Sequence, residues 1–186
     1  AMSFHGSLDS AGLFLSGIKL GSDDVLTGTI AVSTPAPDQT GSNAYRSNAY
    51  HGEINLMSAA TGERLECSAG LSFDNGIMID GSLNIENMAL ARFFRTQGKG
   101  NTLTAQAVFS GTPDNLILQC TMPQLSWFIQ GHDLLASGDL RFENNRAELV
   151  TGEASWGAHR VSGIAGYFSL SDLTGMLDAD YAGEAV

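Results

Sequence analysis

Apolar and polar side chains alternate almost without error in residues 64–87, "RLECSAGLSFDNGIMIDGSLNIEN". One phase of the first half carries the apolar side chains, namely Leu65, Cys67, Ala69, Leu71 and Phe73. After Asp74-Asn75-Gly76 the apolar phase resumes with Ile77, Ile79, Gly81, Leu83 and Ile85. Successive side chains of a β-strand point to opposite faces, and an Asn-Gly step suits a turn that needs positive φ. The segment therefore predicts a β-hairpin with one apolar face.

Similar alternation recurs along the chain and predicts about a dozen short strands. The segments that show it are 12–20, 25–32, 51–57, 103–109, 116–122, 125–129, 140–142, 147–149, 161–167 and 176–181. Most are joined by short turns, such as Gly111-Thr112-Pro113-Asp114-Asn115. Short connections place consecutive strands side by side and antiparallel. The expected fold class is an all-β antiparallel meander.

Residues 86–101, "ENMALARFFRTQGKGN", are the one helical candidate. Asn87 is suited to cap a helix, and Leu90 and Phe94 would stack one turn apart. Gly98 is suited to end it. The spacing predicts one short helix near residues 87–97.

The segment 33–52, "STPAPDQTGSNAYRSNAYHG", contains two prolines and predicts a long loop. Loops of this length are uncommon inside compact domains, where they are either functional or mobile. We favour a mobile loop here. Tyr45 and Tyr50 are its candidates for aromatic display, which keeps a carbohydrate-binding surface module open as an alternative.

Composition supports an all-β chain of one domain. Only 16% of the 186 residues are charged, 43% are apolar, and 22 are glycine. Many short strands separated by glycine-containing turns give this profile, and the length is sufficient to bury a core. Ala1-Met2 is typical of a cloning remnant, so we expect residues 3–186 to form a single β domain that is a fragment of a longer repeat protein.

The formal net charge of −11 argues against a nucleic-acid partner and against anionic membrane surfaces, because phosphate groups would be repelled. Such a charge is also an ordinary aid to solubility. The sequence contains no apolar run near the eighteen residues that a membrane-spanning helix needs.

The sequence predicts no catalytic chemistry, no metal site and no cofactor. Its histidines are scattered without metal-ligand spacing: His5, His51, His132 and His159. Residues 66–70 lack the first glycine of a nucleophile elbow, and Gly98-Lys99-Gly100 lacks the glycine and hydroxyl positions of a phosphate loop. We expect a protein that is not an enzyme.

The two cysteines and the two tryptophans fall in apolar phases. Cys67 and Cys120 are expected to act as small hydrophobes, and a disulfide between them is open but less favoured. Trp127 shares the phase of Leu125 and Ile129, and Trp156 is also expected to face inward.

A sheet with one apolar face can protect that face in three ways. Two sheets can close into a dry sandwich, one sheet can close into a barrel, or a bent sheet can keep an apolar groove. An exposed leucine-sized side chain forfeits about 1.5–3 kcal/mol, so a groove would be narrow or occupied. All three arrangements need the same alternation, so periodicity leaves them open.

Residues 136–181 carry the motifs Gly-x-Leu-x-Phe, Val-x-Gly-x-x-Gly and Leu-x-x-Leu-Thr-Gly-x-Leu, with an Asn-Asn turn after the first. This pattern resembles the repeats of the AsmA-like/TamB family. "FSGTPDNL", 109–116, is similar to that family's junction between repeats, and the hairpin 64–87 followed by "MALARFF" is similar to its strand pairs and linking helices. The resemblance covers residues 51–181.

The resemblance implies a long periplasmic protein anchored in the inner membrane. That family folds as a taco-shaped β-sheet with an apolar inner groove, and it is implicated in phospholipid movement to the outer membrane or in outer-membrane protein assembly. The implied fold is an antiparallel meander curved into a taco-like groove or open barrel. The implied partners are a phospholipid or other acyl chain and an outer-membrane barrel protein.

Mapped onto this chain, the resemblance implies a lipid groove lined by Leu65, Cys67, Leu71, Phe73, Ile77, Ile79, Leu83, Ile85, Leu103, Phe109, Leu116, Leu118, Met122, Leu140, Phe142, Leu149 and Tyr167. The same side chains could instead pack on each other as a core. Two other hypotheses remain: a dry β-sandwich adhesin or surface-binding module that uses the loop 33–52, and an assembly factor whose groove holds a β-strand of a client protein.

Overall fold

The computed structural model describes residues 2–9, 12–20, 26–34, 49–73, 76–92, 100–129 and 131–182. Its elements are β1(Met2–Asp9), β2(Gly12–Leu20), β3(Leu26–Ser33), β4(Ala49–Met57), β5(Arg64–Ser72), β6(Met78–Ala89), the 3-10 helix η1(Leu90–Arg92), β7(Thr102–Thr112), β8(Asn115–Ile129), β9(His132–Glu143), β10(Arg146–Trp156), β11(His159–Ser169) and β12(Gly175–Ala182).

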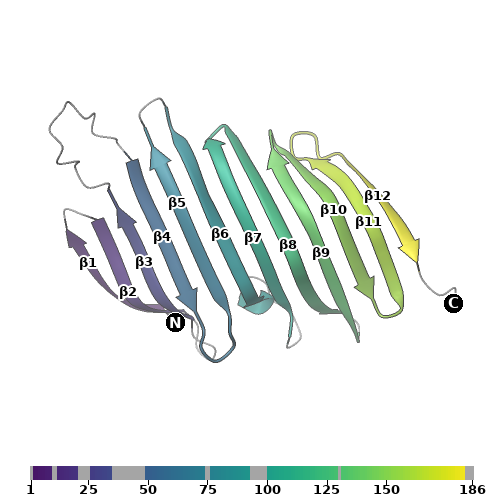
Figure 1. Cartoon of the computed structure of the whole chain (residues 1–186), viewed down its shortest axis with the longest axis horizontal. Helices are drawn as coiled ribbons and strands as arrows, with labels where there is room; N and C mark the ends of the chain where they lie inside the picture. Colours follow the sequence, from purple (N-terminus) through teal and green to yellow (C-terminus); the bar gives the residue numbers. More distant parts are fainter. Residues whose placement is uncertain are drawn as a thin grey trace.

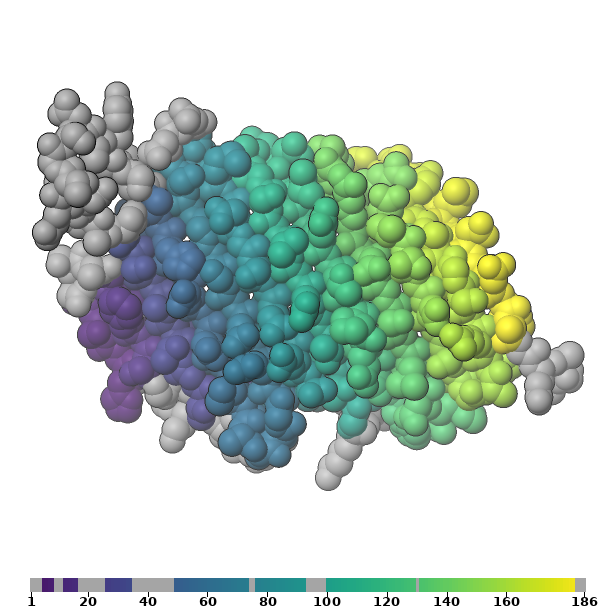
Figure 2. Space-filling view, viewed as in Figure 1, coloured from purple at the N-terminus to yellow at the C-terminus, as the bar shows by residue number. Residues whose placement is uncertain are grey.

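The twelve strands form one sheet in the order of the sequence, β1 to β12 (Figure 1). Every neighbouring pair is antiparallel, and the space-filling view shows the strands as successive bands from one end to the other (Figure 2). The all-β antiparallel meander is therefore confirmed. β1 and β12 are free edges, so the sheet is not closed into a barrel. The described strands belong to one sheet, so the two-sheet sandwich is wrong for them.

The hairpin predicted from residues 64–87 is confirmed as β5 and β6. Leu65 pairs with Ile85, Cys67 with Leu83, and Leu71 with Ile79, so the apolar phases of both strands share one face. Gly76 has φ +111°, a conformation that glycine adopts without strain. Asp74 and Asn75 of the expected turn lie outside the described residues.

Strand pairing extends this separation of apolar from polar side chains across the sheet, which therefore has two distinct faces. The apolar face is the one that holds Leu65 and Ile85, and the polar face is its opposite. All Asp, Glu and Arg residues within strands β3–β12 lie on the polar face: Glu53, Arg64, Glu66, Asp80, Glu86, Asp133, Asp139, Arg141, Glu143, Arg146, Glu148, Glu153, Arg160, Asp178 and Asp180. The apolar face of these strands carries two imidazoles, His132 and His159, but no Asp, Glu, Lys or Arg side chain.

The apolar face divides into two halves that differ in burial. The buried apolar residues all belong to β3–β7 and η1, and Met88 at their centre is 0% exposed. We name this region the packed half. No large apolar side chain of β8–β12 is buried, and we name the apolar face of these strands the open half.

The predicted helix near residues 87–97 is wrong where the structure describes it. β6 continues to Ala89, and only Leu90–Arg92 form a single 3-10 turn. Asn87 does not cap a helix; it has φ +49° at a register shift between β6 and β7, and its backbone N–H donates to Thr104 Oγ1 at 3.1 Å. Asparagine tolerates this left-handed conformation better than most residues. Phe94 and Gly98 lie outside the described residues.

Two further differences concern the N-terminal third. Residues 2–9 form β1, which no apolar alternation had indicated. Residues 35–48 of the expected loop, including Tyr45, lie outside the described residues. Tyr50 is not a loop residue, because it lies in β4 on the apolar face, where its ring meets the edge of Phe73 at 6.1 Å between centroids.

Candidate functional site

The predicted lining residues gather on one surface. Every one that lies within a strand, apart from Tyr167, is on the apolar face. Phe73 directly follows β5, and its contact with Tyr50 places its ring beside the same face. Ile77 directly precedes β6 and is exposed. The predicted set therefore spans both halves: its members in β5–β7 belong to the packed half, and those in β8–β10 to the open half.

Tyr167 is the exception, and a β-bulge is the reason. Gly163 has φ +60°, and the pairing of β11 with β12 shifts between Ser162 and Ala165. The extra residue moves the side chains that follow it to the other face. Tyr167 consequently pairs with Glu148 on the polar face, where the Arg146 guanidinium lies 4.0 Å from the centre of its ring.

The open half has no protein layer over it among the described residues. β8–β12 make substantial contacts only with their neighbours in the sheet. Large apolar side chains on this face remain exposed, including Leu140 at 37%, Phe168 at 42% and Leu177 at 68%. Soluble proteins rarely leave contiguous apolar patches larger than a few hundred Å², and such patches mark binding surfaces.

An uncharged path crosses the apolar face at right angles to the strands. Paired residues on β3 to β12 form it, and we name it the transverse row: Ile30, Ile54, Cys67, Leu83, Ala107, Cys120, Leu140, Leu149, Gly166 and Leu177. At about 4.8 Å between neighbouring strands, the nine steps span roughly 43 Å. The row is longer than the hydrocarbon core of a bilayer, which is about 30 Å thick.

A hollow of about 540 Å³ lies on the open half near the C-terminal edge. It is lined by Leu140, Ala147, Glu148, Leu149, Gly166, Tyr167, Phe168, Gly175, Met176 and Leu177. Glu148 is the single charged residue of this set, and it belongs to the polar face. A Cβ at Gly166 would lie 2.2 Å from the backbone oxygen of Met176, so glycine is required for β12 to approach β11 there.

Both cysteines lie in the transverse row as free thiols. Cys67 and Cys120 are three strands apart, roughly 14 Å, which is too far for a disulfide. Burial, followed by the negative charge of Asp139, raises the pKa of the Cys120 thiol. Cys120 is therefore a neutral, weakly polar part of the apolar face.

In the packed half, the carboxylate of Glu63 lies on the apolar side of the sheet, and hydrogen-bond donors offset the cost of burying its charge. Glu63, 2% exposed, accepts hydrogen bonds from the Ala89 backbone N–H and Arg92 Nε, both at 2.8 Å, and from Thr61 Oγ1 at 2.6 Å. The hydrogen bond from Arg92 is the main reason that the pKa of Glu63 falls to about 2. These hydrogen bonds tie η1 and the end of β6 to the segment before β5, and Leu90 in η1 is buried.

Four rings cross one end of the open half, and sequence spacing had not brought them together. His132, Trp156, His159 and Tyr181, on β9 to β12, form successive ring contacts with centroids 5.7, 6.3 and 5.9 Å apart. We name them the aromatic row. His159 Nδ1 and Tyr181 Oη share a hydrogen bond of 2.5 Å, and Trp156 Nε1 donates to the Ile129 carbonyl at 3.4 Å. Trp127 lies at the same end, in line with Leu134 and Trp156.

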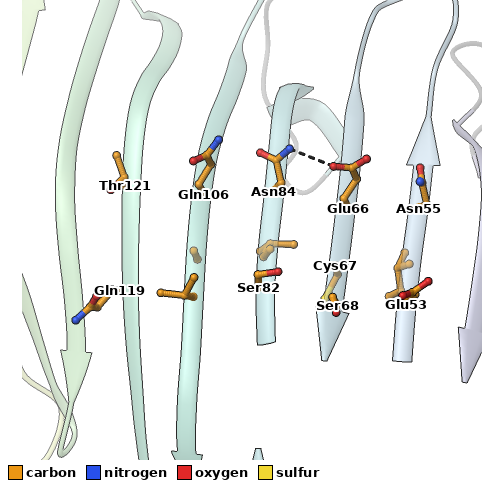
Figure 3. Close-up of a pocket in the computed structure, with 14 residues that line it drawn as sticks. Glu53, Asn55, Glu66, Cys67, Ser68, Ser82, Asn84, Gln106, Gln119 and Thr121 are labelled. Atoms are coloured by element: carbon orange, nitrogen blue, oxygen red, sulfur yellow. Dashed lines mark hydrogen bonds between the residues drawn. The ribbon is translucent and has the colours of Figure 1, made fainter. Parts of the chain in front are cut away.

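The polar face has its own hollow, of about 590 Å³, over β4–β8. Figure 3 shows the polar side chains that line it, which are Glu53, Asn55, Glu66, Ser68, Ser82, Asn84, Gln106, Gln119 and Thr121. Asn84 Nδ2 donates to Glu66 and to Glu86, both at 3.3 Å. Across the described ranges, no group of three or more His, Cys, Asp or Glu residues could hold a metal ion.

Within the same ranges, no helix is long and apolar enough to cross a membrane. No family model, curated protein or solved structure matches the chain.

Proposed function

We propose that this chain is a non-enzymatic lipid-binding β-sheet whose apolar face shields acyl chains from water. Following the resemblance to AsmA-like proteins, we place it in the periplasm as a segment of a longer groove. There it would contribute to phospholipid transport between the inner and outer membranes, or to outer-membrane protein assembly. The observation that carries the proposal is the open half: five strands whose apolar face holds no Asp, Glu, Lys or Arg and over which the described part of the chain places no protein layer.

Energetics support an apolar occupant. An acyl chain that covers about 200 Å² of the open half would gain roughly 5 kcal/mol, before the entropic cost of association, at about 25 cal/mol per Å². A gain of that size gives weak binding, which suits a surface along which lipid moves. The transverse row supports the same role, because a chain moving across it meets no charged side chain.

A client β-strand is the rival occupant, and it would use a different part of the sheet. An added strand needs free backbone N–H and C=O groups, which the sheet offers along its edges at β1 and β12. The backbone groups of β8–β11 are already paired within the sheet. The open half therefore favours a ligand that needs no backbone hydrogen bonds, as an acyl chain does.

Two leucines of β9 give a matched test. Leu140 lies on the apolar face in the transverse row, whereas Leu135 lies on the polar face and is 47% exposed. Leu140→Asp should lower the amount of bound fatty acid or phospholipid at least tenfold, because the lipid would have to desolvate a carboxylate. Leu135→Asp should leave binding unchanged.

The measurement is lipid extraction and mass spectrometry of the purified proteins after incubation with phospholipid vesicles, with far-UV circular dichroism as the control for folding. Equal lipid retention by the two folded variants would contradict the proposal. Absence of bound lipid in the unsubstituted protein would contradict it as well.

A further inference from the structure

The open half is polarised along its strands. One end carries the aromatic row, whose rings bear nitrogen and hydroxyl groups. The other end of the same strands carries purely apolar positions, which pair across the sheet as Phe142, Ala147, Phe168 and Gly175. The surface between them holds the hollow around Leu140 and Leu149.

Rings of this type suit a boundary between apolar and aqueous surroundings. Trp, Tyr and His present an apolar body and a polar tip, and Trp and Tyr are enriched where one end of the ring is dry and the other is wet. In the aromatic row three of the four rings are fixed by hydrogen bonds, His159 and Tyr181 by the bond between them and Trp156 by its bond to the Ile129 carbonyl. The row thus holds its rings in place at the polar boundary of the open half.

From this gradient we infer that the bound lipid lies along β9–β12, with its polar head group at the aromatic row and its acyl chain directed toward Phe168. The inference rests on the proposed function and specifies the orientation of its ligand. The occupant is an amphiphile with one polar end, because a ligand that is apolar throughout would gain nothing from the polar tips. Head groups at this end of the strands can remain in water.

The dimensions agree with this orientation. Trp156 lies nine positions after Ala147 along β10. At about 3.3 Å per position these steps span roughly 30 Å, whereas one acyl chain of a bilayer leaflet needs about 15 Å, so a chain that starts at the aromatic row ends over the middle of the strands. The hollow of about 540 Å³ falls on this path, next to Phe168.

Intrinsic fluorescence can test the orientation, because both tryptophans of the chain lie at the end of the strands that carries the aromatic row. Trp156 belongs to the row, and Trp127 lies in line with Leu134 and Trp156. The probes are phosphatidylcholine vesicles in which bromine, a contact quencher, is placed on acyl carbons near the glycerol or near the methyl end. Head-group binding at the row predicts that bromine near the glycerol quenches at least twice as strongly as bromine near the methyl end.

A second protein moves the reporter to the position expected for the methyl end of the acyl chain. Leu177→Trp in a Trp127→Phe/Trp156→Phe background places the single tryptophan at an exposed apolar position of the hollow, four residues and therefore about 13 Å from Tyr181 of the aromatic row, where the substitution is tolerated. The order of quenching should then reverse. Retention of the brominated lipid by each protein is measured in parallel, and circular dichroism checks folding.

Opposite quenching orders in the two proteins support the orientation. If lipid is retained but the order is the same in both proteins, or the two bromine positions quench equally, the orientation is overturned while the proposed function stands. If the unsubstituted protein retains no lipid, the proposed function fails and the orientation falls with it.

Discussion

Glu63 offers the sharpest test of how the packed half is held together. Its carboxylate lies on the apolar side of the sheet and accepts hydrogen bonds from Arg92, Thr61 and the Ala89 backbone. The Arg92 side chain is itself only 18% exposed. Glu63→Gln keeps the size of the side chain but removes its charge, so the partly buried Arg92 loses its ion pair with Glu63.

The pKa of Glu63 gives the size of its contribution to the free energy of unfolding. It falls from 4.5 to about 2 on folding, chiefly because of the hydrogen bond from Arg92. Since one pKa unit corresponds to about 1.36 kcal/mol, the ionised carboxylate contributes about 3 kcal/mol to the free energy of unfolding. The folded-state pKa is below the unfolded-state value, so this contribution is complete above pH 4.5 and is lost as the pH falls through about 2. Glu63→Gln should therefore cost about 3 kcal/mol at neutral pH and almost nothing at pH 2.

Urea unfolding between pH 2 and pH 7, followed by tryptophan fluorescence and circular dichroism, measures this difference. Glu153→Gln is the matched control, because Glu153 also pairs with an arginine, Arg160 at 2.7 Å, but both side chains are more than half exposed. Exposed pairs contribute little, so the control should change stability by less than about 1 kcal/mol. The reasoning would be refuted if acidification lowered the stability of Glu63→Gln and of the unsubstituted protein by the same amount.

Three further predictions follow from single positions. Leu90→Ala should lower the free energy of unfolding by about 2–3 kcal/mol in urea, because Leu90 is buried and its truncation leaves a cavity. Unchanged stability would contradict this. Gly166→Val should speed amide hydrogen exchange in β12, because the Cβ of the valine would collide with the Met176 carbonyl, while β5 stays protected. Equal protection of β12 and β5 in the variant would contradict the close approach of β12 to Gly166. Asn87→Gly should be nearly neutral in urea unfolding and Asn87→Val should cost about 1–2 kcal/mol, because φ is +49° at this residue; equal effects would contradict the bulge.

The sequence could predict the strands and their faces because alternation is a local property. In β5 and β6 each apolar residue sits two positions from the next, and the pairing of Leu65 with Ile85 follows once the turn is placed. The same logic placed Leu118, Leu140 and Leu149 on one face although they lie on three strands.

Bulges limited that prediction. Gly163 and Asn87 each take positive φ where the register of pairing shifts, and no alternation pattern reveals such an inserted residue. Tyr167 was consequently assigned to the wrong face. Near Asn87, the spacing of Leu90 and Phe94 suggested a helix in a segment where the strand continues to Ala89.

The aromatic row could not be predicted because it depends on register between strands far apart in the sequence. Trp156 and His159 are joined by a tight turn, but His132 and Tyr181 reach them only through the pairings of β9 with β10 and of β11 with β12. Residue spacing alone contains no such information, so the histidines looked unrelated.

Strict pairing of each strand with its sequence neighbours has a consequence for how the sheet assembles. A strand in this arrangement needs only its predecessor, so the sheet can grow hairpin by hairpin from one end. The same property lets duplication or deletion of a hairpin lengthen or shorten the sheet without disturbing the strands on either side. The width of the sheet across its strands can thus evolve independently of the chemistry of its apolar face.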